Sequence, residues 1–66
     1  MKDYVFKLLI DGQFSGEGYG QGNSAMEAFE NGVETGSIYF PDEQEIEVLA
    51  LSNRGLGIRF KAVKGL

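Results

Sequence analysis

The sequence contains no cysteine and no histidine among its 66 residues. Their absence excludes disulfide bonds, thiolate nucleophiles, zinc sites of the usual kind and imidazole catalysis. Because small secreted domains are usually stapled by disulfides, we expect a cytoplasmic protein. The core of so short a chain must be thin. Because disulfides and the usual zinc sites are excluded, self-association is the remaining source of additional stability.

Long hydrophobic runs are also missing. The apolar stretch that follows Met1-Lys2-Asp3 is too short for a secretory signal or a membrane span. The length predicts one domain over residues 1–66. Five phenylalanines, three tyrosines and a net charge of only −4 are typical of a chain that folds.

Basic residues are absent from the middle of the chain. Neither Lys nor Arg occurs between Leu8 and Asn53, whereas nine of the ten acidic residues lie there. The chain then closes with four basic residues and no acid: Arg54, Arg59, Lys61 and Lys64. An acidic balance disfavours non-specific attraction to nucleic acid or to anionic membranes. We therefore expect an acidic side and a basic end.

The first half of the chain predicts a β-hairpin. Residues 3–10 are rich in aromatic and branched side chains, and Asp11-Gly12 is typical of a two-residue type I′ turn. This turn predicts the pairs Ile10 with Gln13, Leu9 with Phe14, Leu8 with Ser15, Phe6 with Glu17 and Tyr4 with Tyr19. In that register Gly16 and Gly18 lie beside Lys7 and Val5.

Four glycines at positions 16, 18, 20 and 22 follow the two-residue period of a strand. One face of this strand therefore carries no side chains, and a helix, a second sheet or a partner can approach its backbone. Free amides before a helix can also bind an anion. The run lacks the Lys of a phosphate-binding loop, however, and Glu17 lies within it, so we favour close packing.

A helix is predicted over residues 25–35. Ser24 and Glu27 have the spacing of a capping box, and Gly36 is the expected C-terminal stop. Met26, Phe29 and Val33 recur at helical spacing and form its expected apolar stripe.

A second hairpin is predicted from strands over residues 45–51 and 56–63, joined by a loop over 53–55 with Gly55 left-handed. This register sets Glu47 opposite Lys61 and turns Leu56, Ile58, Phe60 and Ala62 inward. The predicted fold is α+β, in the order ββαββ, with one helix on one face of a four-stranded antiparallel sheet. Its expected core is Tyr4, Phe6, Leu8, Ile10, Met26, Phe29, Val33, Ile46, Val48, Ile58 and Phe60.

No constellation of residues indicates catalysis. The sequence offers no nucleophile and base pair, and we expect neither an enzyme nor a cofactor. The acids at 42, 43, 45 and 47 lack the order of a calcium-binding loop, so we expect a solvated acidic surface and no metal.

The far face of the predicted sheet is unusually apolar. Six residues point away from the helix: Val5, Leu9, Phe14, Leu49, Leu51 and Val63. A patch of this size usually marks an interaction site, unless the segment over residues 37–41 or a twist of the sheet covers it. We therefore expect a non-catalytic protein-interaction module of adaptor or inhibitor type that self-associates, as a homodimer, through this exposed face or through an edge strand. The acidic helix could in addition meet a basic partner through Glu27, Glu30 and Glu34.

The alternative is a nucleic-acid-binding domain. Phosphate contact needs clustered cations, which the C-terminal hairpin supplies as Arg54, Arg59, Lys61 and Lys64. Pairing of Arg59 and Lys61 with Glu45 and Glu47 would leave little excess positive charge there. For that reason the interaction module is the favoured hypothesis.

Overall fold

The computed structural model describes residues 1–55 and 57–63. It has the ββαββ order, with four antiparallel strands in one sheet and a single helix between the second and third strands. The elements are β1 (Lys2–Ile10), β2 (Gln13–Gly22), α1 (Ala25–Thr35), β3 (Glu45–Ser52) and β4 (Gly57–Val63). The order of strands across the sheet is β2-β1-β3-β4. Leu56, which was predicted to point inward, and Lys64, which was predicted to belong to the basic cluster, lie outside the described residues.

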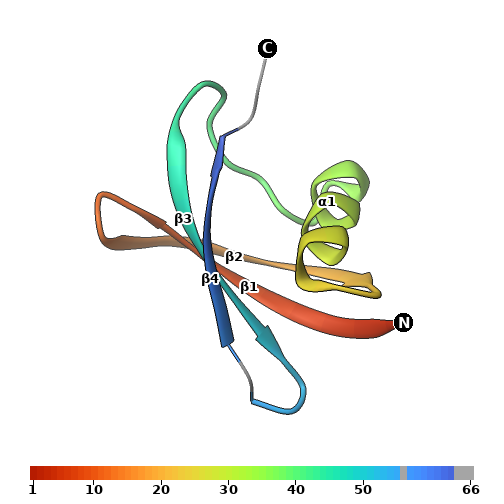
Figure 1. Ribbon diagram of the computed structural model, residues 1–66. Helices are drawn as coiled ribbons and strands as arrows, with labels where there is room; N and C mark the ends of the chain where they lie inside the picture. The colour runs from red at the N-terminus through yellow and green to blue at the C-terminus, as the bar shows by residue number, and fades with distance from the viewer. Residues whose placement is uncertain (56, 64–66) are drawn as a thin grey trace.

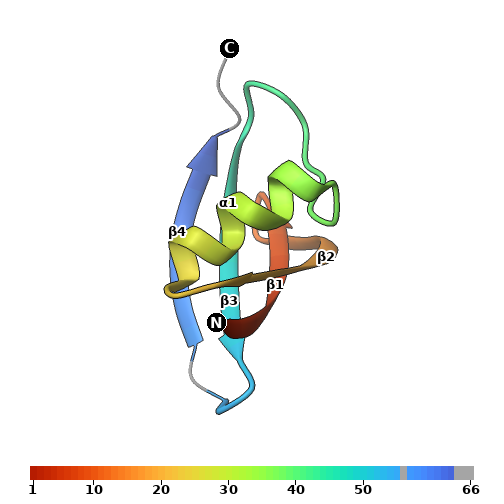
Figure 2. The same cartoon turned by 90° about the vertical axis from the view of Figure 1, so that its right-hand side faces the viewer.

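The molecule has two layers and is only 15 Å thick along its shortest axis. The β1–β2 ribbon crosses the β3–β4 ribbon in Figure 1, so the sheet is strongly twisted. Figure 2 shows α1 lying across one face of this sheet. We call the opposite face, away from α1, the outer face. No helix or strand of the described chain lies over it.

The first hairpin contains a β-bulge that the sequence did not reveal. Asp11 and Gly12 have φ values of 53° and 78°, as the type I′ turn requires, and Leu9 pairs with Phe14. The register then shifts, so that Leu8 pairs with Gly16 and Ser15 is the extra residue. The predicted pairs Leu8 with Ser15, Phe6 with Glu17 and Tyr4 with Tyr19 are therefore wrong. Since side chains alternate along a strand, the bulge turns the glycines toward the helix and residues 17 and 19 outward.

The face of β2 that carries glycines packs directly against the backbone of α1. A Cβ built on Gly20 would lie 1.9 Å from the carbonyl oxygen of Ala28, and one on Gly22 would lie 2.6 Å from its amide nitrogen. The close-packing interpretation is thus confirmed for Gly18, Gly20 and Gly22, whereas a Cβ on Gly16 would meet no atom within 4 Å. The buried residues of the helix are mostly small: Ala25, Ala28, Phe29 and Gly32. The prediction for Met26 is wrong, because its side chain is 51% exposed and lies beside this small-residue stripe.

Phe29 is the residue through which α1 joins the rest of the core. Its ring centroid lies 5.4 Å from that of Phe6, 5.3 Å from Phe60 and 5.9 Å from Phe40. These distances fit the edge-on and offset contacts that aromatic rings prefer. One side chain therefore connects the helix to β1, to β4 and to the segment after the helix.

The segment that follows the helix contributes to the core on the helix side. Ile38 and Phe40 are 2% and 4% exposed, although neither belonged to the expected core. Ile58 was expected inside but is 52% exposed, because α1 packs mainly against β2 and β1 and meets β4 at Phe60. The buried apolar residues are Tyr4, Phe6, Leu8, Ala25, Ala28, Phe29, Ile38, Phe40, Ile46, Val48 and Ala50. The residues packed against them are Ile10, Val33, Phe60 and Ala62.

Candidate protein-docking face

The outer face carries the six apolar residues that the sequence analysis assigned to it. The register places them on all four strands, as Val5 and Leu9 on β1, Phe14 on β2, Leu49 and Leu51 on β3, and Val63 on β4. Phe14 and Val63 are 65% and 55% exposed, and the other four are half-buried. The segment over residues 37–41 does not cover them, because its apolar side chains Ile38 and Phe40 belong to the core on the other side.

The bulge adds a seventh apolar residue to this face. Tyr19 pairs with Val5, and Val5 pairs with Leu51 on its other side, so the three side chains form one row across three strands. Tyr19 is 61% exposed. The predicted register set Tyr19 opposite Tyr4, which is the wrong face. The bulge at Ser15 changes that register, and no local sequence motif predicts the bulge.

A row of charged residues divides the apolar surface of the outer face. Glu17 pairs with Lys7, and Lys7 pairs with Leu49, which in turn pairs with Arg59. Both Lys7 and Glu17 are exposed. On one side of this central row lies the row of Tyr19, and on the other side Phe14 pairs with Leu9. Lys7 and Glu17 therefore lie between the apolar row of Tyr19 and the apolar pair of Phe14 and Leu9, and the row of that pair continues across β3 and β4 as Glu47 and Lys61.

The charges on the outer face nearly cancel. Three basic residues and four acidic ones lie on it by register, which gives a net charge of −1; they are Lys7, Arg59, Lys61, Asp3, Glu17, Glu45 and Glu47. The whole chain carries −4. The excess of negative charge therefore lies away from this face, on the helix and in the connections at Asp11 and at residues 42–43.

The basic C-terminal hairpin is accompanied by acids. Glu47 pairs with Lys61 in the register, as predicted. The ion pairs run diagonally, with 3.7 Å between Arg59 Nε and Glu47 Oε1 and 3.8 Å between Lys61 Nζ and Glu45 Oε1. Such exposed pairs contribute little stability, but they neutralise the cations locally. Arg54 lies in the turn beyond β3, apart from these two pairs.

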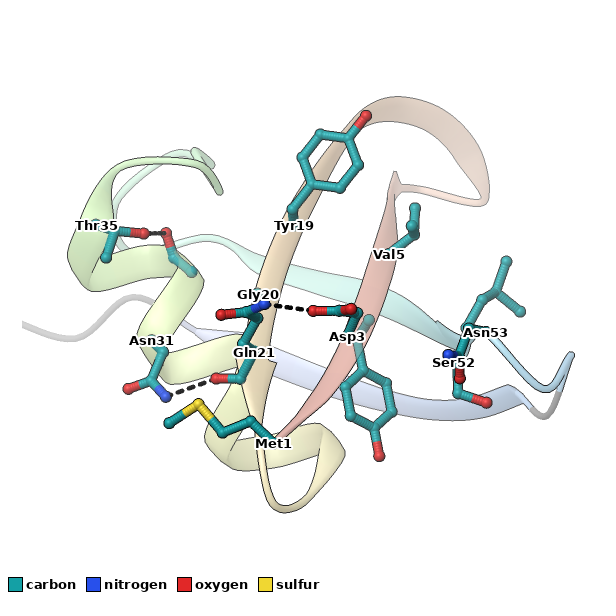
Figure 3. Close-up of a pocket in the computed structure, with 13 residues that line it drawn as sticks. Met1, Asp3, Val5, Tyr19, Gly20, Gln21, Asn31, Thr35, Ser52 and Asn53 are labelled. Atoms are coloured by element: carbon teal, nitrogen blue, oxygen red, sulfur yellow. Dashed lines mark hydrogen bonds between the residues drawn. The ribbon is translucent and has the colours of Figure 1, made fainter.

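One end of the outer face is hollowed. Figure 3 shows this hollow, which measures about 750 Å³ and is lined by Val5, Tyr19 and Leu51. Gln21 Nε2 donates a hydrogen bond to Asp3 Oδ1 within it. The lining continues around the edge of β2 to Asn31 and Thr35 of the helix; the remaining lining residues are Met1, Tyr4, Gly20, Gly32, Ser52 and Asn53. The row of Tyr19 therefore borders a concave, largely uncharged surface.

Part of the edge of β2, at Tyr19 and Gln21, is closed by side chains from the helix side. Asn31 Nδ2 donates to the carbonyl oxygen of Gln21 at 2.8 Å, and Ser37 Oγ donates to that of Tyr19. These carbonyls would otherwise be free to pair with a strand of another chain. The opposite edge of the sheet, β4, carries Arg59 and Lys61.

The three acids of α1 do not form one free surface. Glu27 belongs to the helix cap, where its amide donates to Ser24 Oγ and its carboxylate accepts from the amide of Asn23, both at 3.2 Å. Glu30 and Glu34 are exposed. They border a smaller hollow of about 350 Å³, which is also lined by Phe29, Val33, Phe40, Ala62 and Val63.

Residues 1–55 and 57–63 contain no group of three or more acidic side chains arranged to hold a metal ion. Within the same residues, the single helix is neither long nor apolar enough to cross a membrane. No known protein family, curated protein or solved structure matches this chain at a significant level. The assignment of a function therefore depends on the geometry of the molecule itself.

Proposed function

We propose that this protein is a non-catalytic protein-interaction module, of adaptor or inhibitor type, that self-associates through its outer face. The observation that carries the proposal is the set of seven apolar side chains on a sheet face that lies opposite the helix. Three of them, Phe14, Tyr19 and Val63, are more than half exposed, at 65%, 61% and 55%. An exposed apolar surface of this kind usually marks an interaction site.

The edges of the sheet are less suitable for self-association than its face. On β2, Asn31 and Ser37 already bond to edge carbonyl groups. Antiparallel pairing of two β4 strands would bring the outward-facing cations Arg59 and Lys61 close to those of the second copy. Like charges opposite one another destabilise strand pairing. These features favour contact through the face.

Nucleic-acid binding by the C-terminal hairpin is supported less well. Arg59 and Lys61 each lie within 4 Å of a carboxylate, so a phosphate would have to compete with Glu47 and Glu45. The outer face as a whole has no excess of positive charge, and such an excess is the electrostatic requirement for phosphate binding.

The proposal is tested by two double variants with matched changes. Phe14→Ser with Tyr19→Ser removes exposed apolar groups from the outer face, and Met26→Ser with Ile58→Ser removes apolar groups that are about half exposed from the helix side. In sedimentation equilibrium the wild-type mass should rise from 7.2 kDa toward twice that value with concentration. The outer-face variant should remain a monomer and the helix-side variant should associate normally. Equal behaviour of the two variants would contradict the proposal.

A further inference from the structure

We propose that two copies of this chain meet by their outer faces with Lys7 and Glu17 at the centre of a two-fold interface. This inference rests on the proposed function and adds the arrangement of the partner. A two-fold contact joins the same patch on both copies, so the patch must be complementary to itself. The central row satisfies this requirement because it carries both signs of charge.

Charge restricts where two copies can meet. Each chain carries −4, and Glu27, Glu30 and Glu34 lie on the helix side, so contact between two helix sides would be repulsive. On the outer face the net charge is −1, and basic and acidic side chains lie next to one another. The outer face is therefore the surface on which this acidic chain can approach a second copy.

The charged pair lies between apolar side chains along the strands. Lys7 and Glu17 lie between the row of Tyr19 and the pair of Leu9 and Phe14. A two-fold contact that buries the apolar side chains on both sides must therefore enclose this pair together with its counterpart. Two lysines and two glutamates then lie together, and each can face the opposite charge across the interface.

The size of the molecule limits the strength of such a contact. Its two longer dimensions are 29 and 23 Å, so the face projects over an area of about 670 Å² in each copy. A standard protein interface buries roughly 800 Å² per partner. An interface of this area needs the apolar side chains on both sides of the charged pair as well as the pair itself. We therefore expect dissociation constants that are measured at micromolar concentrations.

The arrangement is tested by exchanging the two charges. Lys7→Glu yields a chain with two acids at the centre, and Glu17→Lys yields one with two bases. Each variant alone would bring four like charges together, so its self-association should weaken by at least about tenfold. An equimolar mixture should form heterodimers with an affinity within about threefold of the wild type, because opposite charges then face each other. Sedimentation and fluorescence titration measure both quantities.

A helix-side exchange with the same net charges is the control. Lys2→Glu and Glu30→Lys are expected to self-associate like the wild type, and mixing them should change nothing. Circular dichroism and thermal melting verify that each variant is folded. If a charge reversal prevents folding, neutral variants replace it: Lys7→Gln and Glu17→Gln should each weaken association, and the double variant should recover it.

Three outcomes would overturn the arrangement. They are single exchange variants that dimerise like the wild type, a mixture that stays monomeric although both variants are folded, and a neutral double variant that is no better than the single ones. If the double variant at Phe14 and Tyr19 still abolishes association in those cases, the outer face remains the docking surface and only the arrangement is wrong. A wild-type chain that is monomeric at millimolar concentration would instead contradict both proposals.

Discussion

The Cβ atom that Gly20 lacks would lie 1.9 Å from the carbonyl oxygen of Ala28. This separation is far shorter than any van der Waals contact, and the clashing atom belongs to the helix backbone. The helix therefore lies where it does because residue 20 has no side chain. The bulge at Ser15 turns that bare position toward the helix, and it turns Glu17 and Tyr19 to the outer face. The bulge therefore determines both how the helix packs on β2 and which residues of β2 lie on the docking face.

Gly20→Ala should strongly destabilise the fold. The added methyl group can be accommodated only if the helix moves away from β2, which we expect to lower the free energy of unfolding by about 3 kcal/mol. Urea denaturation followed by circular dichroism measures the change. Gly16→Ala is the matched control, because its Cβ would meet no atom within 4 Å, and it should be neutral or stabilising by up to about 1 kcal/mol. Equal losses in the two variants would contradict this account of the helix packing.

Deletion of Ser15 should leave the fold intact. Without the extra residue the ladder between β1 and β2 becomes regular, and every side chain from Gly16 to Gly22 keeps its face. Deletion of Ser15 together with Gly16 shifts the alternation by one residue, so the side chain of Tyr19 would point into the helix and the native fold should be lost. Dispersion in a proton–nitrogen correlation spectrum should therefore survive the single deletion and disappear in the double deletion. A double deletion with native dispersion would show that the bulge does not set the faces of β2.

We expect the two cations of β4 to form exposed ion pairs and not a nucleic-acid-binding site. We expect Arg59→Ala and Lys61→Ala each to change the free energy of unfolding by less than about 1 kcal/mol. The wild-type protein should not shift single- or double-stranded polynucleotides at low salt. The alternative function requires the opposite result: binding that weakens steeply with salt and that both substitutions reduce.

Most of the fold could be predicted because local sequence motifs mark the ends of its helix and the turns between its strands. Asp11-Gly12 forms the expected turn, Ser24 accepts the expected amide of Glu27, and Gly36 and Gly55 have the expected positive φ. Each of these signals lies within four residues of the feature that it determines. The alternation of β3 and β4 was sufficient to place Glu47 opposite Lys61.

The errors arose where a feature depends on contacts between distant residues. Nothing near Ser15 indicates a bulge, which is needed because the glycines must face a helix that comes later in the chain. Ile38 was missed as a core residue for the same reason, since its pocket is formed by Gly18 and Gly32. The candidate site was consequently incomplete: Phe14 was placed correctly, but Tyr19 was assigned to the opposite face.

The central claim, that the outer face docks against a second copy, is tested most directly by isotope-filtered nuclear Overhauser spectra. The sample is an equimolar mixture of carbon-13-labelled and unlabelled protein at millimolar concentration. The account predicts intermolecular contacts between the methyl groups of Val5, Leu49 and Leu51 and the rings of Phe14 and Tyr19. Spectra without intermolecular contacts, or with contacts only from helix-side residues such as Met26, would contradict it.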